Sequence, residues 1–181
     1  KLIIENIYYC DANIKACEFY KENFAEFCAE VFNISLDGAY FSTHIGNALL
    51  FDVTNENPTY ISLQDVFPAL KKADIIITNP PYKNFKAETK HYETKEAYEK
   101  DIAIYSAIKE KASSLLKYST DGILNFYKLF TEEIIEHYAD ENTFLNLLIP
   151  SSILSDKSCV DLRKHILKNY KIVSIKVVPE E

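Results

Sequence analysis

An apolar run at residues 73–78, Ala-Asp-Ile-Ile-Ile-Thr, leads directly into the tetrapeptide Asn79-Pro80-Pro81-Tyr82. A short apolar run that ends in turn residues predicts a buried strand of a parallel sheet. Each proline pushes the residue before it towards extended backbone and lacks an N–H, so the loop after this strand is expected to be rigid. Because α/β sheets bind their ligands beyond the carboxyl ends of the strands, we expect the active site at this loop.

Predicted strands and helices alternate along the rest of the chain. Further strands are predicted at residues 5–10, 40–45, 143–149 and 172–178, and helices at residues 13–31, 63–72, 97–118, 123–134 and 155–168. Asn13 is the expected N-cap of the first helix, and Ser155 or Asp156 that of the last. The alternation predicts one α/β domain over residues 1–181, with a mostly parallel sheet and helices on both faces.

The composition is that of a globular protein, since 48% of the 181 residues are apolar and 26% are charged. No apolar run is long enough to span a membrane and the first residues lack a signal-peptide layout, so we expect a cytoplasmic protein. The sequence contains no Met. Lys1 is therefore not a translational start, and we expect the chain to be a piece of a longer protein.

The Cys and His residues show no metal-binding pattern. Neither CxxC nor HExxH spacing occurs in the sequence. We therefore predict no metal site and buried thiols at the four scattered cysteines, Cys10, Cys17, Cys28 and Cys159.

The net charge of −7 lies entirely within residues 1–70, where three Lys face ten Asp and Glu. An acidic or neutral surface lacks the positive charge on which nucleic-acid affinity depends, so other parts of the protein must hold any DNA substrate. Residues 83–100 form a charged segment in which Lys83, Lys86 and Lys90 are candidate DNA contacts. A solvated loop is the alternative interpretation of this segment.

The tetrapeptide has the groups needed to bind a planar ring that bears an amino group. The side-chain oxygen of Asn79 and the carbonyl oxygen of Pro80 are two acceptors for one NH2, and Tyr82 offers a flat face for stacking. A heteroaromatic amine is a weak nucleophile because its lone pair is delocalised into the ring. Two acceptors localise that lone pair, so a sulfonium methyl donor needs only in-line positioning and electrostatic preorganisation. A Pro-Pro turn of purely structural purpose is the alternative.

With these residues the chain resembles the N6-adenine DNA methyltransferases that use S-adenosyl-L-methionine, in particular the catalytic module of type II or IIG restriction-modification enzymes. The segment Leu-Leu-Ile-Pro-Ser-Ser-Ile-Leu at residues 147–154, followed by Asp-Leu-Arg at residues 161–163, is also similar to this group. The resemblance implies that Asn79 and Pro80 bind the amino group of an adenine flipped out of double-stranded DNA. Tyr82 would stack on the base, and Pro81 would belong to the same rigid catalytic motif.

The resemblance also implies two contacts to the cofactor. Asp11, at the end of the first predicted strand, corresponds to the acidic residue with which the family binds the ribose hydroxyls. Asn47 corresponds to the residue that contacts the adenine of the cofactor. The alternatives are that Asp11 only caps a helix and that Asn47 is only a turn residue.

Some parts of this family's architecture have no counterpart in the sequence. The glycine-rich loop that wraps the methionine portion of the cofactor is missing, because Gly38, Gly46 and Gly122 form no GxG pattern. The first strand is missing too, so its neighbours pair directly, a second chain fills the gap, or the protein is longer. DNA recognition is then expected from a separate specificity domain or subunit.

The resemblance thus implies a Rossmann-like, S-adenosylmethionine-dependent methyltransferase fold without its first strand and glycine-rich loop. We expect residues 1–181 alone to be inactive and to bind the cofactor weakly or not at all. Two other functions remain open. The same tetrapeptide occurs in protein-glutamine N5-methyltransferases that act on release factors, and a catalytically inactive module that binds DNA or a subunit is also possible.

Overall fold

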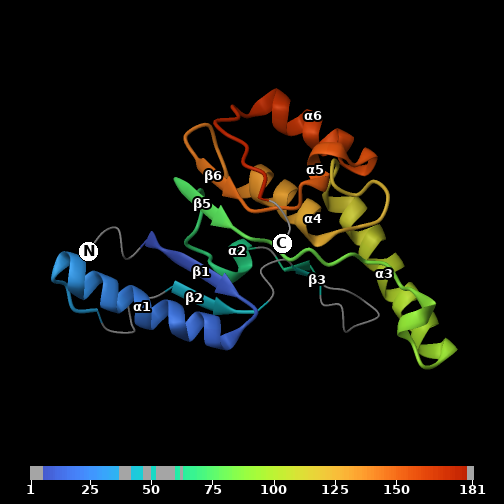
Figure 1. Cartoon of the computed structure of the whole chain (residues 1–181), viewed down its shortest axis with the longest axis horizontal. Helices are drawn as coiled ribbons and strands as arrows, with labels where there is room; N and C mark the ends of the chain where they lie inside the picture. Colours follow the sequence, from blue (N-terminus) through green and yellow to red (C-terminus); the bar gives the residue numbers. More distant parts are fainter. Residues whose placement is uncertain (1–5, 37–41, 47–49, 52–59, 62, 179–181) are drawn as a thin grey trace. The chain divides into compact units, whose positions relative to one another are not determined.

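The computed structural model describes residues 6–36, 42–46, 50–51, 60–61 and 63–178 (Figure 1). The chain divides into two compact units. The first consists of Lys1–Phe51 and Thr59–Lys71, and the second of Asp52–Pro58 and Lys72–Glu181. Each unit is described by itself below, and a single domain over the whole chain stays a prediction.

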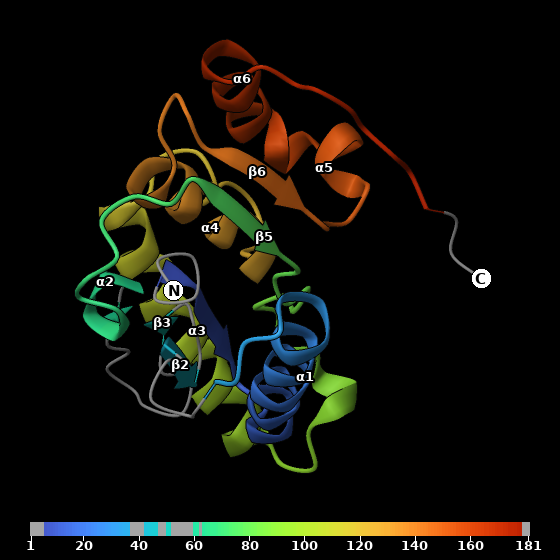
Figure 2. The same cartoon turned by 90° about the vertical axis from the view of Figure 1, so that its left-hand side faces the viewer.

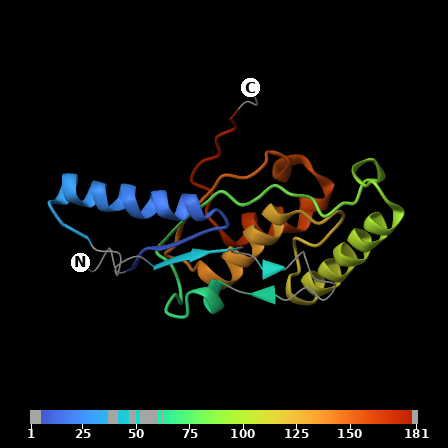
Figure 3. The same ribbon diagram turned by 90° about the horizontal axis from the view of Figure 1, so that it is seen from below.

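The first unit is built on a strand, a helix and a second parallel strand. β1 (Tyr8–Asp11) pairs with β2 (Ser42–Ile45), in a register that places Asp11 opposite Ile45. The helix α1 (Ile14–Phe32) packs against both strands (Figure 3). The unit also contains an antiparallel pair, β3 (Leu50–Phe51) with β4 (Tyr60–Ile61), and the short helix α2 (Leu63–Val66).

The ends of α1 follow from local chemistry, as predicted. The Asn13 side chain accepts a hydrogen bond from the Lys15 N–H, which satisfies one of the free donors of the first turn. At the other end Asn33 has a φ of 53°, and this left-handed backbone turns the chain so that the Ile34 N–H reaches the Cys28 carbonyl. The predicted helix at residues 13–31 is therefore confirmed to within one residue at each end.

The second unit contains another parallel pair, β5 (Ile75–Thr78) with β6 (Phe144–Leu147), which lie side by side in Figure 2. Its helical segments are, in chain order, η3 (Thr89–His91), α3 (Lys95–Leu115), α4 (Phe126–Glu133), the π-helix η4 (Ile134–Tyr138), α5 (Ser152–Ser155), η5 (Lys157–Cys159) and α6 (Val160–Asn169). The prediction of a mixed α/β fold is confirmed, and the described strands form two short parallel pairs and one antiparallel pair.

The helix α4 forms the core of the second unit and is buried along its whole length. Its polar side chains have partners within the unit. The Glu132 carboxylate accepts hydrogen bonds from the backbone N–H groups of Tyr118 at 3.0 Å and Ser119 at 2.8 Å, and from that of Lys117. The Lys128 ammonium group donates to the Asp121 carbonyl at 2.8 Å. A helix with no exposed face is stable only when its polar groups are paired in this way.

Three predictions about the second unit were wrong. The strands at residues 73–78 and 143–149 were expected to be buried, but Ile75 is 65% exposed, Ile77 is 76% exposed and Phe144 is also exposed. A parallel pair places register partners on the same side, so one face of the β5–β6 pair is open.

The second error concerns residues 172–178, which were predicted to be a strand and have no regular structure. Their apolar side chains, such as Val173 and Val177, are exposed. Strand formation requires a pairing partner, and residues 172–178 pair with none of the strands in the described ranges.

The third error concerns Ile123, which was placed in the buried stripe of a helix at residues 123–134. It is 50% exposed, because α4 begins only after the N-cap Asn125. In the first unit, the helix predicted at residues 63–72 ends at Val66.

Candidate active site

The tetrapeptide lies directly after β5, as predicted. The Thr78 carbonyl accepts a hydrogen bond from the Leu148 N–H at 3.0 Å, so the carboxyl ends of β5 and β6 are tied together where the loop begins. Pro80 is buried, whereas Asn79, Pro81 and Tyr82 are exposed. The side chains of Asn79 and Tyr82, which carry the hydrogen-bonding and stacking groups, are therefore exposed, while Pro80 between them is buried.

Asn79 and Tyr82 contact each other. The Tyr82 hydroxyl lies 2.8 Å from Asn79 Oδ1 and 2.9 Å from the carbonyl oxygen of Leu148, and its single proton can be donated to either of them. Tyr82 nevertheless remains 46% exposed. The loop is thus folded so that the amide of its first residue and the hydroxyl of its last meet beside the end of β6.

Asn125, which the sequence analysis did not assign to the site, contacts the loop from the other side. Its side-chain NH2 donates to the Tyr82 carbonyl at 3.3 Å and to Asn84 Oδ1 at 2.6 Å. Its Oδ1 accepts from the Tyr127 N–H at 3.0 Å and thereby caps α4. An Asn before the apolar run of α4 is a recognisable N-cap. Its contact with Tyr82 spans 43 residues and had no local signal.

The chain after the tetrapeptide is held against the same end of α4. The Phe85 N–H donates to the Leu124 carbonyl at 2.9 Å, and the Phe126 N–H donates to the Lys83 carbonyl at 3.1 Å. The Phe85 ring is buried with its centroid 4.4 Å from that of Phe126. Residues 83–85 are therefore fixed by backbone pairing and by aromatic packing.

The segment at residues 147–154, which resembles the DNA enzymes, is anchored by α4 as well. The Tyr127 hydroxyl lies 3.2 Å from Ser152 Oγ and 3.4 Å from Cys159 Sγ. Burial, together with the Cys159 thiol, raises the pKa of Tyr127 to about 12, so the hydroxyl keeps its proton at neutral pH. The first turn of α4 thus contacts both family-like segments through Asn125 and Tyr127.

Asp11 belongs to the first unit and ends β1, where the sequence placed it. Its carboxylate accepts from the Asn13 N–H at 2.8 Å and from the Tyr9 hydroxyl at 3.5 Å. Its backbone carbonyl accepts from the Gly46 N–H at 2.9 Å. The half-buried carboxylate is thus oriented at the carboxyl end of a parallel strand. Asn47, the other predicted cofactor contact, lies outside the described residues.

Two of the three candidate DNA contacts, Lys86 and Lys90, have an acidic partner within the chain. Lys86 and Lys90 form ion pairs with Glu88 at 3.1 Å and 2.7 Å. The hydrogen bonds from Lys90 and then from Lys86 hold the pKa of Glu88 below its ordinary value. Each of these pairs neutralises part of the positive charge that a DNA backbone needs.

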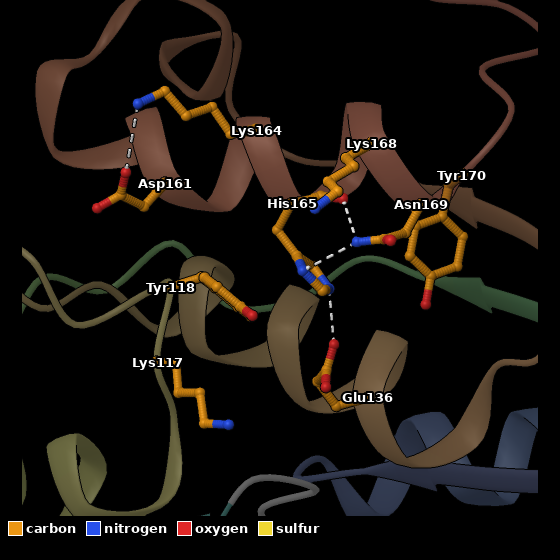
Figure 4. A pocket seen from close by; sticks show the side chains of 9 residues that line it. All are labelled: Lys117, Tyr118, Glu136, Asp161, Lys164, His165, Lys168, Asn169 and Tyr170. Atoms are coloured by element: carbon orange, nitrogen blue, oxygen red, sulfur yellow. Dashed lines mark hydrogen bonds and ion pairs between the residues drawn. The ribbon is translucent and has the colours of Figure 1, made fainter.

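A separate hollow of about 700 Å³ lies in the second unit (Figure 4). At its centre the His165 ring stacks on Tyr118 with 4.1 Å between centroids. Glu136 Oε1 lies 2.6 Å from His165 Nε2, and the Asn169 amide contacts Nδ1 at 3.2 Å. None of the lining residues belongs to the tetrapeptide, and the Glu136–His165 pair links η4 to α6.

The predicted buried thiols are confirmed at Cys17, Cys28 and Cys159, whereas Cys10 is half-buried with a pKa that burial raises to about 11. Within the described ranges, no three His, Cys, Asp or Glu side chains are grouped so that they could hold a metal ion. No helix in the described part of the chain is long and apolar enough to cross a membrane.

Comparison with known proteins identifies the family. The family model for the Eco57I restriction-modification methylases matches residues 5–180, which is nearly the whole chain. A search of curated proteins and a search of solved structures gave no significant match. The matched region includes β1, the tetrapeptide after β5 and the segment at residues 147–154. The chain therefore belongs to the Eco57I restriction-modification methylase family.

Proposed function

We propose that the chain is the catalytic module of a DNA methyltransferase that transfers a methyl group from S-adenosylmethionine to N6 of adenine. The observation that carries this proposal is the exposed pair Asn79 and Tyr82, which is presented after β5 with a hydrogen-bonding amide beside an aromatic ring. Membership of a restriction-modification methylase family supports methyl transfer. The geometry accounts for an exocyclic amine, and the choice of adenine rests on the resemblance of the tetrapeptide to that of the N6-adenine enzymes.

The residues of the loop act on the amine of the substrate. Asn79 Oδ1 and the Pro80 carbonyl accept its two hydrogens and draw the lone pair out of conjugation with the ring. Tyr82 stacks on the base once the base has left the duplex. Both acceptors belong to a loop with a rigid backbone, so the backbone needs little reorganisation during the reaction.

The Tyr82 hydroxyl sets the orientation of the Asn79 amide. A hydroxyl has one proton and can donate to only one acceptor at a time. When Tyr82 donates to the Leu148 carbonyl, rotation of the Asn79 amide turns its NH2 towards the Tyr82 oxygen and its Oδ1 outward. The amide oxygen is then available to the substrate amine, and the amide nitrogen is occupied.

The residues of this chain could bind part of the proposed cofactor. Methyltransferases of such families generally use S-adenosylmethionine, whose sulfonium supplies the methyl group. The oriented carboxylate of Asp11 suits a ribose diol, because it can accept hydrogen bonds from both hydroxyls. No glycine-rich loop for the methionine portion occurs in the sequence. Asp11 is therefore the residue proposed to hold the cofactor, with Asn47 as a second proposed contact.

We also propose that the sheet is Rossmann-like and that the protein is cytoplasmic. Double-stranded DNA is the proposed substrate, and a specificity domain or subunit of the full-length protein is the proposed source of sequence recognition. The parallel β1–β2 and β5–β6 pairs support the Rossmann-like arrangement, since each places a proposed site residue at its carboxyl end.

The test is to express the full-length protein in a host without DNA methyltransferases and to analyse the nucleosides of its DNA by mass spectrometry. We expect N6-methyladenine, with single-molecule sequencing placing it in one recurrent sequence. N4-methylcytosine alone would refute the choice of adenine. Unmodified DNA together with N5-methylglutamine in a release factor would support the protein methyltransferase, and absence of both would support the inactive module.

A further inference from the structure

We propose that Asn125 is a positioning residue for methyl transfer, which holds the backbone of Tyr82 and thereby fixes the substrate loop to the first turn of α4. This inference rests on the proposed function. It concerns a residue outside the tetrapeptide, and it is carried by the hydrogen bonds of the Asn125 side chain.

The orientation of the Asn125 amide follows from its surroundings. The Tyr127 N–H, 3.0 Å away, is a donor and needs an oxygen, so Oδ1 must point towards α4. The NH2 group then points towards the loop, where two oxygens accept from it. These are the Tyr82 carbonyl at 3.3 Å and Asn84 Oδ1 at 2.6 Å. One half-buried side chain thus joins the helix to the loop with both ends of its amide.

The position of Tyr82 depends on two distant anchors. Its hydroxyl is held by the Leu148 carbonyl at the end of β6, and its carbonyl is held by Asn125 at the start of α4. The backbone pairing of residues 83–85 with residues 124–126 begins only after Tyr82. Asn125 is therefore the side chain that extends this pairing back to the stacking residue, at the place where a small shift moves the ring relative to the substrate.

The test compares variants that separate the cap from the contact with the loop. Ser and Asp both cap helices as well as Asn does, and neither can donate to the Tyr82 carbonyl as the Asn amide does. In the full-length protein we expect Asn125→Ser to lower kcat at least about fivefold, with unchanged affinity for S-adenosylmethionine and an unchanged melting temperature. We expect Asn125→Asp to lower kcat in the same way. A folded Asn125→Ser or Asn125→Asp variant with a wild-type kcat would overturn the proposal.

Two controls separate positioning from a general structural role. Asn84→Ala removes the other acceptor of the Asn125 NH2 and leaves the Tyr82 carbonyl as its partner, so we expect a kcat within about twofold of the wild type. Asn142→Asp makes the same Asn-to-Asp change at an exposed position before β6 and should also leave kcat unchanged. A loss of kcat in Asn84→Ala equal to that of Asn125→Ser would contradict the route through Tyr82.

A double variant provides the decisive comparison. If Asn125 acts by holding Tyr82, Asn125→Ser should cause no further loss of kcat in a Tyr82→Ala background, because no stacking ring remains to be positioned. Full additivity of the two losses would overturn the proposal. A wild-type protein that does not methylate adenine refutes the proposed function instead, so the two failures are distinguishable.

Discussion

Tyr82 combines two separable roles in the proposed reaction. Its ring is 46% exposed and available for stacking, while its hydroxyl lies within hydrogen-bonding distance of Asn79 and of the Leu148 carbonyl. In the proposed reaction the ring holds the base, whereas the hydroxyl contacts the rest of the loop and the end of β6. Substitutions that remove one and keep the other should therefore have different effects.

Replacing Tyr82 with Phe removes the hydroxyl and keeps the ring. We expect kcat for DNA methylation to fall about twofold to tenfold, since a hydrogen bond contributes about 0.5–1.5 kcal/mol. Tyr82→Ala should cost more, because stacking of a base on an aromatic side chain contributes a further 1–3 kcal/mol or so. Steady-state methylation assays on both variants check this order, and a Phe variant as slow as the Ala variant would contradict the separation of roles.

The tetrapeptide could be recognised in the sequence because its chemistry is local. Two prolines restrict the backbone of the loop, and an amide and an aromatic ring within the same four residues supply its hydrogen-bonding and stacking groups. The groups that hold them could not be recognised, since Leu148 and Asn125 lie 66 and 43 residues further along the chain. Sequence alone thus predicted the groups that are proposed to act on the substrate, whereas the groups that hold the loop had no local signal.

At the level of single elements, caps were predictable and strands were less so. Asn13 caps α1 as predicted. Asp156, one of the two caps predicted for the last helix, instead caps the short η5 that leads into α6, by accepting from the Ser158 N–H at 2.7 Å. The prediction of a strand at residues 172–178 was wrong. Alternating apolar residues show only that a segment could lie in a sheet, and a strand forms only beside a pairing partner. Sequence signals therefore predicted an element correctly only where the contact that stabilises it is between residues close in the sequence.

The cap at Asp156 should make stability depend on pH in the acidic range. Hydrogen bonds from Ser158 hold the pKa of Asp156 below its ordinary value, so the carboxylate stabilises the fold above the unfolded pKa of about 4. This contribution is lost as the pH falls through the lower, folded pKa. Urea unfolding at several pH values should show Asp156→Ala less stable than the wild type at pH 7, with a difference that shrinks on acidification. A difference independent of pH would argue against the cap.

Glu132 links α4 to the turn after α3 through three backbone donors. Glu132→Ala would remove the acceptor of these three N–H groups, of which that of Ser119 is fully buried, and we expect a loss of stability of about 3 kcal/mol. Chemical denaturation measures this loss, with the exposed Glu141→Ala as the matched control. Equal stability of the two variants would show that the carboxylate is dispensable.

At the level of the whole molecule, the sequence predicted one mostly parallel sheet with helices on both faces. Within the described residues the strands form two parallel pairs, β1–β2 and β5–β6, and the antiparallel pair β3–β4. Their division into two compact units was not predictable, because composition and periodicity do not show which elements pack together. The proposed residues are divided in the same way. Asp11, for the cofactor, belongs to the first unit, and the tetrapeptide, for the substrate, belongs to the second.

This division predicts that binding and catalysis can be separated by mutation. In the full-length protein, Asp11→Ala should weaken S-adenosylmethionine binding about tenfold to a hundredfold, by the loss of charge-assisted hydrogen bonds to the ribose. Isothermal calorimetry measures the Kd, with the exposed Glu18→Ala on α1 as a control for lost negative charge. An unchanged Kd in Asp11→Ala would show that this carboxylate does not bind the cofactor and only accepts the hydrogen bond from the Asn13 N–H.

The most direct test of the tetrapeptide as the methyl-acceptor site is Asn79→Ala in the full-length protein, with N6-methyladenine quantified in the product DNA. Loss of one preorganised hydrogen-bonding group should lower kcat about 100-fold to 1000-fold. The Kd for S-adenosylmethionine should stay at the wild-type value, because Asn79 acts on the substrate amine. Adenine methylation at the wild-type rate by the Asn79→Ala protein would contradict the assignment of this loop as the active site.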